Sequence, residues 1–472
     1  MHSRTIRRGD RQPAETIAAI ATPPGRGGIG VIRVSGADVA PIVAGIVQRA
    51  LAPRTATLAT FRGARGEPID QGLALYFPSP HSYTGEEVLE LCGHGGPAVL
   101  RLLLERCVEL GARVARPGEF TQRAFLNGKL DLAEAEAVAD LIDAATATAA
   151  RAAARSLVGM FSDEVGALAA AVVELRMYCE AALDFPDEDL AFLQAADVRG
   201  RLSAITTRVD RLVASAKQGA LLRDGLNVVV VGRPNVGKSS LLNRLAGEAV
   251  AIVTPFAGTT RDALHAQIEI HGVPVTLIDT AGLRATEDPI ELLGIERTRS
   301  AVRKADLALV LVDASIGEGI DAADAEVLAQ LPSTLARLVV HNKIDLTTIE
   351  PEAASISQET VEGRPKPIER HVFLSAKTGA GVDLLRTEIL EIAGAHQDME
   401  GVFLARGRHL AALHSAAARL TASMRHLATP QPPLELLAED LRVAHKALAE
   451  ITGEFTSDDL LGVIFSRFCI GK

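Results

Sequence analysis

Gly232-Arg-Pro-Asn-Val-Gly-Lys-Ser239 has the residue spacing of a loop that binds nucleotide phosphates. It follows the apolar run Leu226–Val231 and precedes the helix-like stretch Ser240–Ala246, which is the strand, loop and helix order that this motif requires. The two glycines let successive backbone N–H groups turn toward the phosphates, and Lys238 adds a positive charge. These residues predict that the chain binds a nucleoside triphosphate in an α/β domain.

The base is predicted from two motifs farther along the chain. Asn342-Lys-Ile-Asp345 follows the apolar run Leu338–Val340, so it stands at the end of a strand. The Asp345 carboxylate can accept hydrogen bonds from both N–H groups of the guanine edge, whereas adenine has no matching pair of donors. Ser375-Ala-Lys377 follows the short strand His371–Leu374 and supplies the usual backbone support for the guanine oxygen. In this order after a phosphate loop, the motifs predict GTP.

Two further segments lie between these motifs and have the form of switches. Asp279 opens Asp-Thr-Ala-Gly282, where its carboxylate can hold Mg²⁺ through water and the Gly282 amide can sense the γ-phosphate. Thr260, within residues 258–262, offers a hydroxyl to the same Mg²⁺. In many GTPases a glutamine after this Asp-x-x-Gly motif orients the attacking water, but Leu283 stands there. Hydrolysis is therefore either very slow or assisted by another group.

The predicted GTP site and its Mg²⁺ ligands draw on all of these segments. Ser239 and Thr260 are the expected Mg²⁺ ligands. The predicted GTP-binding residues are Asn235, Val236, Gly237, Lys238, Ser239, Ser240, Thr254, Pro255, Phe256, Ala257, Gly258, Thr259, Thr260, Asp279, Thr280, Ala281, Gly282, Asn342, Lys343, Asp345, Ser375, Ala376 and Lys377.

The composition is typical of a large enzyme rich in helices. A length of 472 residues predicts two to four domains. Hydrophobic residues make up 48% of the chain but aromatic residues only 3%, so Ala and Leu are expected to do most of the packing, which favours helices. The cysteines (Cys92, Cys107, Cys179 and Cys469) lack metal-ligand spacing and predict no disulfide framework. Without a signal-peptide core or an apolar run of membrane length, we expect a cytoplasmic protein.

The charge of the chain argues against a protein that grips nucleic acid by itself. The formal net charge is −10, and no Lys/Arg-rich run stands out. One mild cluster is expected to be a solvated face: Arg101, Arg106, Arg113, Arg116 and Arg123.

The sequence changes character along its length and predicts a multidomain α/β protein. After a disordered lead-in over residues 1–15, residues 16–127 alternate short β-like runs with a helix over Pro97–Leu110, which predicts an α+β domain. Residues 128–223 are Ala-rich with helical periodicity, and helical periodicity resumes over residues 396–472. A Ras-like P-loop G domain over residues 224–395 interrupts this all-α domain, so switch movements are expected to reach the helices at both junctions. Residues 349–367 are expected to form a polar loop.

The order of the GTPase motifs resembles the TrmE–Era–Septin-like GTPases, and three anchors outside the G domain resemble the MnmE (TrmE) family of tRNA-modification GTPases. The first anchor is Thr22-Pro-Pro-Gly-Arg-Gly-Gly-Ile-Gly-Val-Ile-Arg33. The second joins Tyr83-Thr-Gly-Glu-Glu-Val-Leu-Glu-Leu91 to Gly93-His-Gly-Gly-Pro97. The third is Phe468-Cys-Ile-Gly-Lys472. The resemblance covers nearly the whole chain.

The resemblance implies a second active site, in the N-terminal domain. Proteins of this family bind a tetrahydrofolate one-carbon donor there, 5-formyl- or 5,10-methylene-tetrahydrofolate, and the matching residues are Arg33, Glu90, Lys129 and Lys472. Glutamate suits the donor edge of a pterin, while arginine and lysine suit carboxylates. From the residues alone, an arginine between apolar neighbours, as Arg33 is, is more often a solvent-facing strand residue. Cys469 is a candidate nucleophile, with a packed thiol as the alternative. His94, between glycines, is expected to be a turn residue.

The resemblance also implies partners and a reaction. Such proteins form homodimers through the N-terminal domain and a heterotetramer with the FAD-dependent protein MnmG, so FAD is expected on the partner. With it they add a carboxymethylaminomethyl or aminomethyl group to carbon 5 of the wobble uridine in certain tRNAs. Because this chain is acidic, we expect tRNA to be held weakly or by a composite surface.

The resemblance further implies how hydrolysis proceeds without the glutamine. In this family K⁺ takes the place of an arginine finger when two G domains meet, and the matching ligands are Asn235, Thr254, Thr259 and the backbone of Phe256. The matching water-positioning acid is Glu291; a solvated acid at the start of a helix is its alternative.

Two other functions are weighed against this one. An Era- or Der-like ribosome-assembly switch would need a KH-like or second GTPase domain, and the sequence shows neither. A septin-like assembly protein would polymerise through its G domains rather than catalyse.

Overall fold

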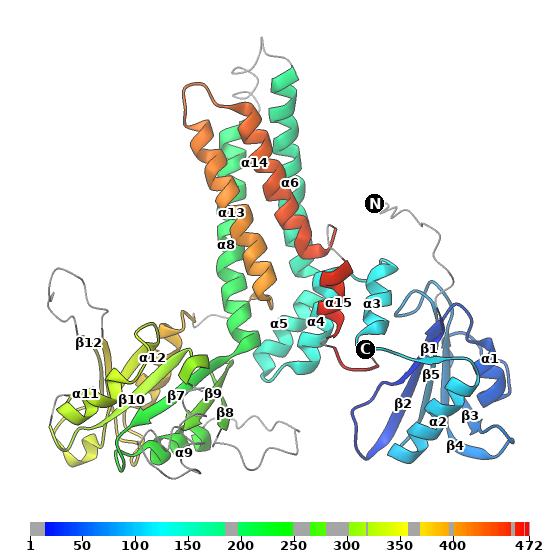
Figure 1. The fold of residues 1–472 in the computed structure, drawn as a ribbon, viewed down its shortest axis with the longest axis horizontal. Helices are drawn as coiled ribbons and strands as arrows, with labels where there is room; N and C mark the ends of the chain where they lie inside the picture. The colour runs from blue at the N-terminus through cyan, green and yellow to red at the C-terminus, as the bar shows by residue number, and fades with distance from the viewer. Residues whose placement is uncertain are drawn as a thin grey trace. The chain divides into compact units, whose positions relative to one another are not determined.

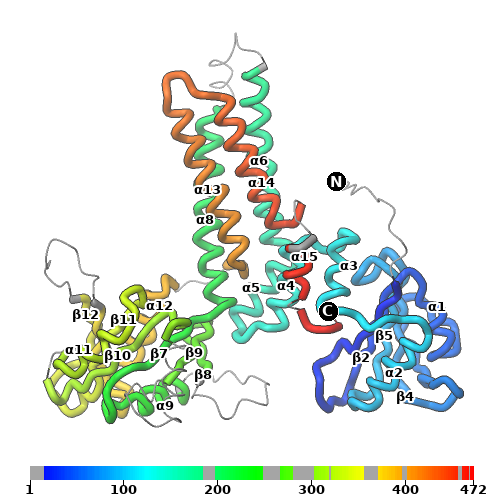
Figure 2. Tube along the Cα trace, in the orientation of Figure 1, coloured from blue at the N-terminus to red at the C-terminus, as the bar shows by residue number. Residues whose placement is uncertain are grey.

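The computed structural model describes residues 15–184, 197–248, 265–279, 302–317, 320–356, 369–395, 401–454, 458–466 and 468–471. The chain divides into two compact units. Figures 1 and 2 show the helices and strands of both units, coloured by residue number. The first unit comprises Met1–Ala139, Leu157–Phe185 and Leu434–Lys472, and the second comprises Asp140–Ser156 and Pro186–Pro433. The helices of the predicted helical domain are therefore shared between the two units. The domain borders drawn from the sequence stay predictions, and the lead-in before residue 15 lies outside the described residues.

The first unit begins with a six-stranded sheet in the order β3-β4-β5-β2-β1-β6. Its strands are β1 (Ile17–Ile20), β2 (Gly27–Gly36), β3 (Thr57–Arg62), β4 (Pro68–Phe77), β5 (Glu87–Gly95) and β6 (Arg113–Val114). Neighbouring strands are antiparallel except β1 and β6. The β-like runs expected at Thr16–Ala21, Gly30–Val34, Gly72–Phe77 and Val88–Leu91 are confirmed by β1, β2, β4 and β5, whereas β3 and β6 were not expected.

Helices cover one face of this sheet. They are α1 (Ala40–Ile42), the π-helix η1 (Val43–Val47) and α2 (Pro97–Glu109). Ile32, Leu91 and Leu103 lie in the buried cluster between the sheet and these helices. Because side chains alternate along a strand, Arg33 and Glu90 project from the face opposite this core.

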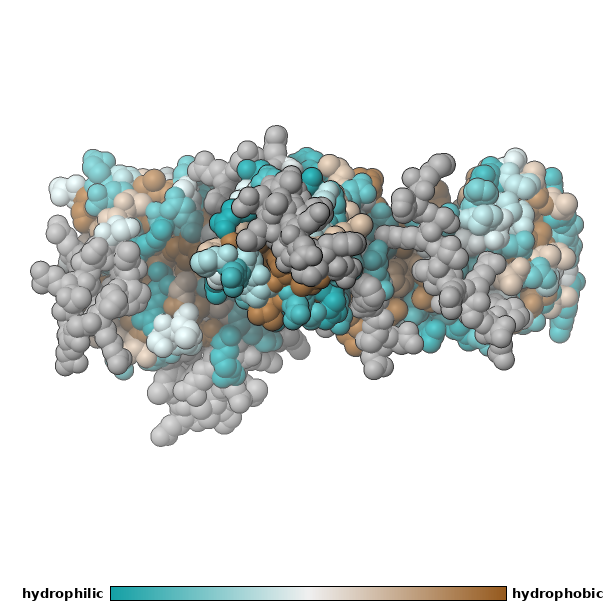
Figure 3. Space-filling view, turned by 90° about the horizontal axis from the view of Figure 1, so that it is seen from above, coloured by the Kyte–Doolittle hydropathy of each residue, from teal (hydrophilic) through white to brown (hydrophobic). Residues whose placement is uncertain are grey.

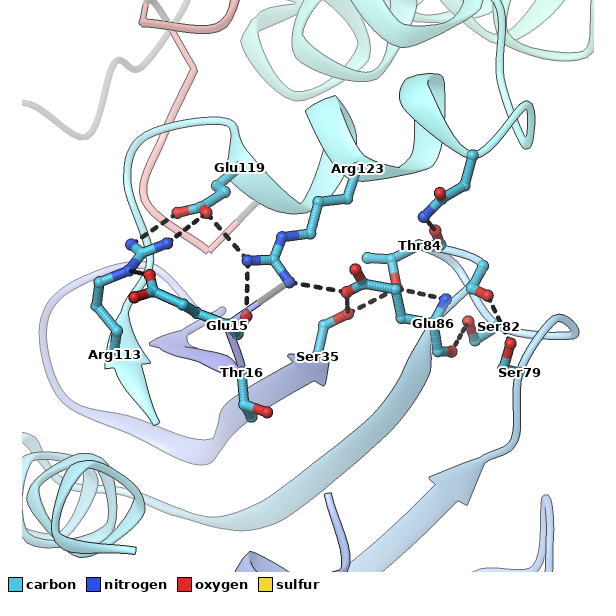
Figure 4. Close-up of polar contacts among 12 residues, drawn as sticks. Glu15, Thr16, Ser35, Ser79, Ser82, Thr84, Glu86, Arg113, Glu119 and Arg123 are labelled. Carbon is cyan, nitrogen blue, oxygen red and sulfur yellow. Dashed lines mark hydrogen bonds and ion pairs between the residues drawn. The ribbon is translucent and has the colours of Figure 1, made fainter. Parts of the chain in front are cut away.

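Helix α3 (Glu119–Leu126) is held to the sheet by buried charges. The Glu119 carboxylate accepts hydrogen bonds from the Arg113 and Arg123 guanidinium groups (Figure 4). It also accepts one from the Arg116 backbone N–H. Arg123 also donates to Glu86, at 2.9 Å. The interpretation of the arginine cluster as a solvated face is therefore wrong for Arg113 and Arg123, which neutralise the Glu119 and Glu86 carboxylates, whereas Arg101 and Arg116 are exposed. Burial raises the pKa of Glu119, but these hydrogen bonds outweigh it and bring the pKa to about 2.

The first unit also contains long helices and the C-terminal segment. These helices are α4 (Leu132–Asp143), whose last four residues belong to the second unit, α6 (Met160–Asp184), α14 (Leu434–Thr452) and α15 (Asp458–Ser466). Helices α6 and α14 lie side by side (Figure 1). Phe465 and Phe468 pack in a buried cluster with Leu132 and Ala135. The C-terminal residues are thus part of the core that joins α3, α4 and α15.

The second unit is built on a seven-stranded sheet in the order β12-β13-β11-β10-β7-β9-β8. Its strands are β7 (Leu226–Gly232), β8 (His265–Ile270), β9 (Val273–Asp279), β10 (Leu307–Asp313), β11 (Ala336–Asn342), β12 (Glu352–Ile356) and β13 (Glu369–Phe373). The five central strands are parallel, and β8 and β12 are antiparallel edges. The prediction of a loop over residues 349–367 is wrong for Glu352–Ile356, which form β12.

Helices pack around this sheet and extend from it. They are α5 (Ala147–Leu157), α8 (Val198–Asp224), α9 (Lys238–Glu248), α11 (Ala322–Ala329), α12 (Val382–Ile392) and α13 (Gly407–Leu427), with a short 3-10 turn, η3, over Ile344–Leu346. Leu222 of α8 and Ala152 of α5 belong to the same buried cluster as the strands. The predicted fold class, a multidomain α/β chain with an α+β N-terminal part, long helices and a P-loop sheet, is confirmed.

The described surface is mixed in polarity. On the face seen in Figure 3, apolar side chains are interspersed with polar ones. Exposed apolar residues in the described part of the chain include Ile29, Val158 and Met177. No single helix in the described ranges is both long and apolar enough to cross a membrane; only the bent pair Ala147–Leu157 and Met160–Leu183 meets those criteria, by length and composition.

The buried Glu119 network predicts acid-sensitive stability. The folded pKa of about 2 lies below the value of 4.5 for a free glutamate, so the stabilisation is complete above about pH 4.5 and is lost as pH falls toward 2. We expect Glu119→Gln to lower the unfolding free energy at pH 7 by roughly 3 kcal/mol, and the difference from wild type to shrink in acid. Tyrosine fluorescence in urea follows this unit, because Tyr76, Tyr83 and Tyr178 all lie in it and the chain has no tryptophan.

Glu105→Gln, an exposed carboxylate on α2, is the matched control and should not move the urea midpoint. Equal midpoints for Glu119→Gln and wild type at pH 7 would contradict the stabilising role of the network.

Candidate functional site

The phosphate loop lies between β7 and α9, at the carboxyl end of a central parallel strand. Its backbone turns through positive φ at Gly232, Asn235 and Gly237, with values of 149°, 65° and 102°. Such a turn points successive N–H groups toward one concavity. The Lys238 ammonium donates to the carbonyls of Gly232 and Arg233, at 2.7 and 2.8 Å. Its charge is thus held at the mouth of the loop, as phosphate binding requires.

Asp279 ends the neighbouring strand β9 and is buried. Burial raises the pKa of its carboxyl, and the nearby Lys238 charge partly opposes the rise. The same burial lowers the pKa of Lys238, with Asp279 opposing. The Asp279 Oδ1 atom has no hydrogen-bond partner among the described residues. A buried acceptor without a donor suits a hydrated Mg²⁺ beside the phosphates, and the exposed Ser239 at the start of α9 fits the same ion.

Asn342, at the end of β11, ties three loops together. Its Nδ2 donates to the Val236 carbonyl at 2.7 Å, and its Oδ1 accepts from the Ala376 N–H at 2.9 Å. The Asn342 side chain lies so close to the phosphate loop that a Cβ at Gly237 would be only 2.2 Å from its Nδ2. The phosphate end and the base end of the predicted GTP site are therefore held in register.

The base-recognition residues gather beside this asparagine. Ser375 Oγ donates to Asp345 Oδ1 at 2.6 Å, which orients the carboxylate. Asp345 is otherwise exposed, and its other oxygen accepts no hydrogen bond from the described part of the chain. Lys343 adopts a left-handed backbone with φ 70°, and its ammonium lies 2.5 Å from Asp313 Oδ2. The geometry leaves a fixed acceptor for the donor edge of guanine.

Asp313 and Arg244 were missed by the sequence analysis. Asp313 ends β10 and holds Lys343. Burial raises the pKa of Asp313. Hydrogen bonds from Lys343 and Ser315 lower it by more, so the pKa lies below its usual value. Arg244 of α9 donates to the carbonyls of Ala376 and Lys377 and so fixes the loop that supports the base. The position of Asp313 after an apolar run at the same sheet edge was the available signal.

Several predicted site residues lie outside the described residues. They are Thr254, Pro255, Phe256, Ala257, Gly258, Thr259, Thr260, Thr280, Ala281, Gly282, Glu291 and Lys472. Within the described ranges, no group of three or more His, Cys, Asp or Glu side chains has the arrangement of a metal centre.

In the first unit the structure brings Arg33 and Glu90 together. They are register partners on β2 and β5, and Arg33 Nε donates to Glu90 Oε1 at 2.9 Å. The Arg33 guanidinium carbon lies 5.4 Å from the Tyr83 ring centroid, a cation–π arrangement. Lys129 donates to the Pro80 carbonyl at 3.2 Å. The Lys129 ammonium is therefore held by a loop carbonyl rather than by the Arg33–Glu90 pair.

Cys469 and His94 have different surroundings from those expected. Cys469 is exposed rather than packed, and its carbonyl accepts from the Gly118 N–H at 3.3 Å. The prediction of a turn at His94 is wrong, because His94 lies in β5. Its Nδ1 lies 2.7 Å from Asp70 Oδ1. Burial raises the pKa of Asp70, but hydrogen bonds from the backbone and ring of His94 outweigh it, so that the pKa is lowered.

Family models and known proteins that carry the name MnmE or TrmE match nearly the whole chain. The family models that match are "MnmE helical domain" over residues 132–469 and "GTP-binding protein TrmE N-terminus" over residues 16–129. The chain is 55% identical over 459 residues to the tRNA modification GTPase MnmE of Dechloromonas aromatica (strain RCB), covering 97% of this chain and 100% of that protein. It is 57% identical over 461 residues to the protein of the same name from Azoarcus sp. (strain BH72), covering 98% and 99%.

A solved structure of an Era variant from Aquifex aeolicus bound to GDP and AlF4⁻ is 28% identical, covers 41% of this chain and 65% of that chain, and has a TM-score of 0.27.

The base site predicts a change of nucleotide on a single substitution. In Asp345→Asn the side chain presents an N–H₂ group where guanine also presents donors, so two charge-assisted hydrogen bonds are lost. We expect the Kd for GTP to rise by about 100-fold or more and the Kd for xanthosine triphosphate to fall, because xanthine has a carbonyl acceptor at carbon 2. Competition against a fluorescent guanine nucleotide measures both constants.

The matched control is Asp383→Asn, an exposed aspartate of the same sheet domain whose partner is Arg386. An unchanged preference for GTP over xanthosine triphosphate in Asp345→Asn would show that another group recognises the base.

Proposed function

The chain belongs to the MnmE family of tRNA modification GTPases, and from this membership we propose that it couples GTP hydrolysis to modification of the wobble uridine. The proposed product carries a carboxymethylaminomethyl or aminomethyl group at carbon 5 of that base. The observation that supports this best is the Arg33–Glu90 pair on the face of the N-terminal sheet opposite α2, which is separate in sequence and fold from the GTP site.

A tetrahydrofolate derivative is the proposed ligand of that pair. When bound, it would supply the one-carbon unit. Glu90 has oxygens for the donor edge of a pterin, and the Arg33 guanidinium can pair with a carboxylate. Lys129 and the terminal Lys472 complete the proposed site. Cys469 is exposed and is retained as a candidate nucleophile toward the base.

Hydrolysis is proposed to depend on K⁺ and on a second G domain. Asn235 supports this, because it is exposed in the phosphate loop and its side-chain amide makes no hydrogen bond within the described ranges. Its oxygen can hold a monovalent cation beside the phosphates, with Thr254, Thr259 and the Phe256 backbone as the other proposed ligands. That charge would offset the charge that develops in the transition state. Glu291 is proposed to position the attacking water in place of the glutamine that Leu283 replaces.

The proposed assembly is a homodimer that works with an MnmG-like FAD protein in a heterotetramer. The net charge of −10 supports a composite surface for tRNA, because a protein that neutralises many phosphates by itself carries an excess of Lys and Arg. FAD belongs to the partner in this proposal, and the assembly is cytoplasmic.

The test is GTP turnover in K⁺ against Na⁺ at equal ionic strength. We expect K⁺ to raise kcat by about tenfold or more, because a correctly placed cation replaces an arginine finger. Asn235→Ala should abolish the stimulation while leaving slow turnover in Na⁺.

The matched control is Asn227→Ala. Asn227 lies near the start of β7, the strand that leads into the phosphate loop, and its side chain donates to Asp306, so this variant should keep the K⁺ effect. Equal, slow rates of the wild type in both salts would refute the proposed role of K⁺.

A further inference from the structure

We propose that Tyr83, Phe120 and Thr121 are positioning residues for Arg33, and that helix α3 couples this arrangement to the C-terminal tail, residues 468–471. The inference rests on the proposed function in taking the Arg33–Glu90 pair as the folate site. The geometric argument uses the first unit alone, which contains every residue involved.

Arg33 is fixed by aromatic rings as well as by Glu90. Its guanidinium carbon lies 5.4 Å from the ring centroid of Tyr83 and 5.9 Å from that of Phe120. The Glu90 contact uses only Nε, and neither terminal nitrogen of Arg33 has a hydrogen-bond partner among the described residues, so both can donate to a ligand. Because a long arginine side chain loses rotamer freedom when it is ordered, rings that hold it in place lower the cost of binding an anionic group.

The two rings are held by one short helix. Phe120 and Thr121 are consecutive on α3, and both are fully buried. The hydroxyls of Tyr83 and Thr121 are 2.8 Å apart, which sets the tilt of the Tyr83 ring. Phe120 packs with Ile17 and Ala19 of β1. A shift of α3 therefore moves both rings against Arg33.

The residue before that helix touches the C-terminal tail. Gly118 precedes α3 with φ 66°, and its N–H donates to the Cys469 carbonyl at 3.3 Å. A Cβ at this position would lie 2.6 Å from the Phe465 carbonyl oxygen and 3.0 Å from the Phe468 Cβ. At the other end of the tail, a Cβ on Gly471 would lie 2.4 Å from the Ile20 carbonyl oxygen of β1. The tail is thus packed against the same elements, α3 and β1, that carry the Arg33 site.

The Tyr83–Thr121 hydrogen bond is tested with three variants. Binding of 5-formyltetrahydrofolate is measured by calorimetry in Tyr83→Phe, Thr121→Val and the double variant. Each should raise Kd by about three- to tenfold, and the double variant should be no weaker than the singles, because one hydrogen bond is lost in all three. Tyr76→Phe, which loses a 2.8 Å hydroxyl contact with Glu87 in the same sheet, should leave Kd within about twofold of wild type.

The coupling to the tail is tested with two glycines of equal backbone strain. Gly118→Ala and Gly128→Ala both place alanine at positive φ, 66° and 67°, but a Cβ at Gly128 meets nothing within 4 Å. Because the chain has no tryptophan, Ile470→Trp adds a single fluorescent reporter to the tail. Gly118→Ala should raise acrylamide quenching of this reporter and raise the folate Kd; Gly128→Ala should do neither.

The outcomes separate the coupling from the proposed function. A wild type that binds no folate would overturn the folate site, and the coupling is then judged without ligand: Thr121→Val must change quenching of the tail reporter. Unchanged quenching in Thr121→Val and Gly118→Ala would overturn the coupling. Folate binding with additive losses in the double variant would overturn the role of the Tyr83–Thr121 hydrogen bond.

Discussion

The carboxamide of Asn342 is the interaction on which the GTP site depends. One end donates to the phosphate loop at Val236 and the other accepts from the base-binding loop at Ala376, so three strand ends share a single side chain. An amide does this because it carries a donor and an acceptor at a fixed separation. The side chain is almost fully buried, so a lost partner would leave an unsatisfied polar group, which costs about 1–3 kcal/mol. Gly237 is required opposite it, because a Cβ there would collide with Nδ2.

The nucleotide site was largely predictable because its parts are local in sequence. Each motif follows an apolar strand, and parallel strands bring their carboxyl ends to one edge of the sheet. Asn235, Lys238, Asn342 and Asp345 could therefore be placed from the order of the motifs alone. The supporting residues Asp313 and Arg244 could not, because their roles come from contacts with Lys343 and Ala376, which lie 30 and 132 positions away in the chain.

The N-terminal domain shows where local reasoning fails. Strand β3 presents only Ala59 and Phe61 to the core, too few apolar residues to stand out as an alternating strand. Arg123 resembles a surface residue in sequence, yet it is buried, because Glu119 and Glu86 supply the charges that make burial possible. His94 lies between glycines, which suggested a turn. The Asp70 carboxylate on β4 instead contacts the backbone N–H and the ring of His94 and so holds this residue in the strand. In each case the deciding partner belongs to another element.

Asp140 contacts both chain segments that connect the sheet of the G domain to the long helices. This buried carboxylate accepts hydrogen bonds from Arg223, just before β7, and from Arg406, just before α13, so one side chain binds the chain where it enters and where it leaves the sheet. Thr146 at the start of α5 donates to the carbonyl of Gly272, in the turn between β8 and β9. That hairpin joins the two segments in which the switch residues were predicted. Because removing one partner of a buried ion pair costs about 3–5 kcal/mol, the Asp140 contacts hold the two chain crossings firmly together. The Thr146 hydrogen bond in turn fixes the turn between β8 and β9 to the start of α5.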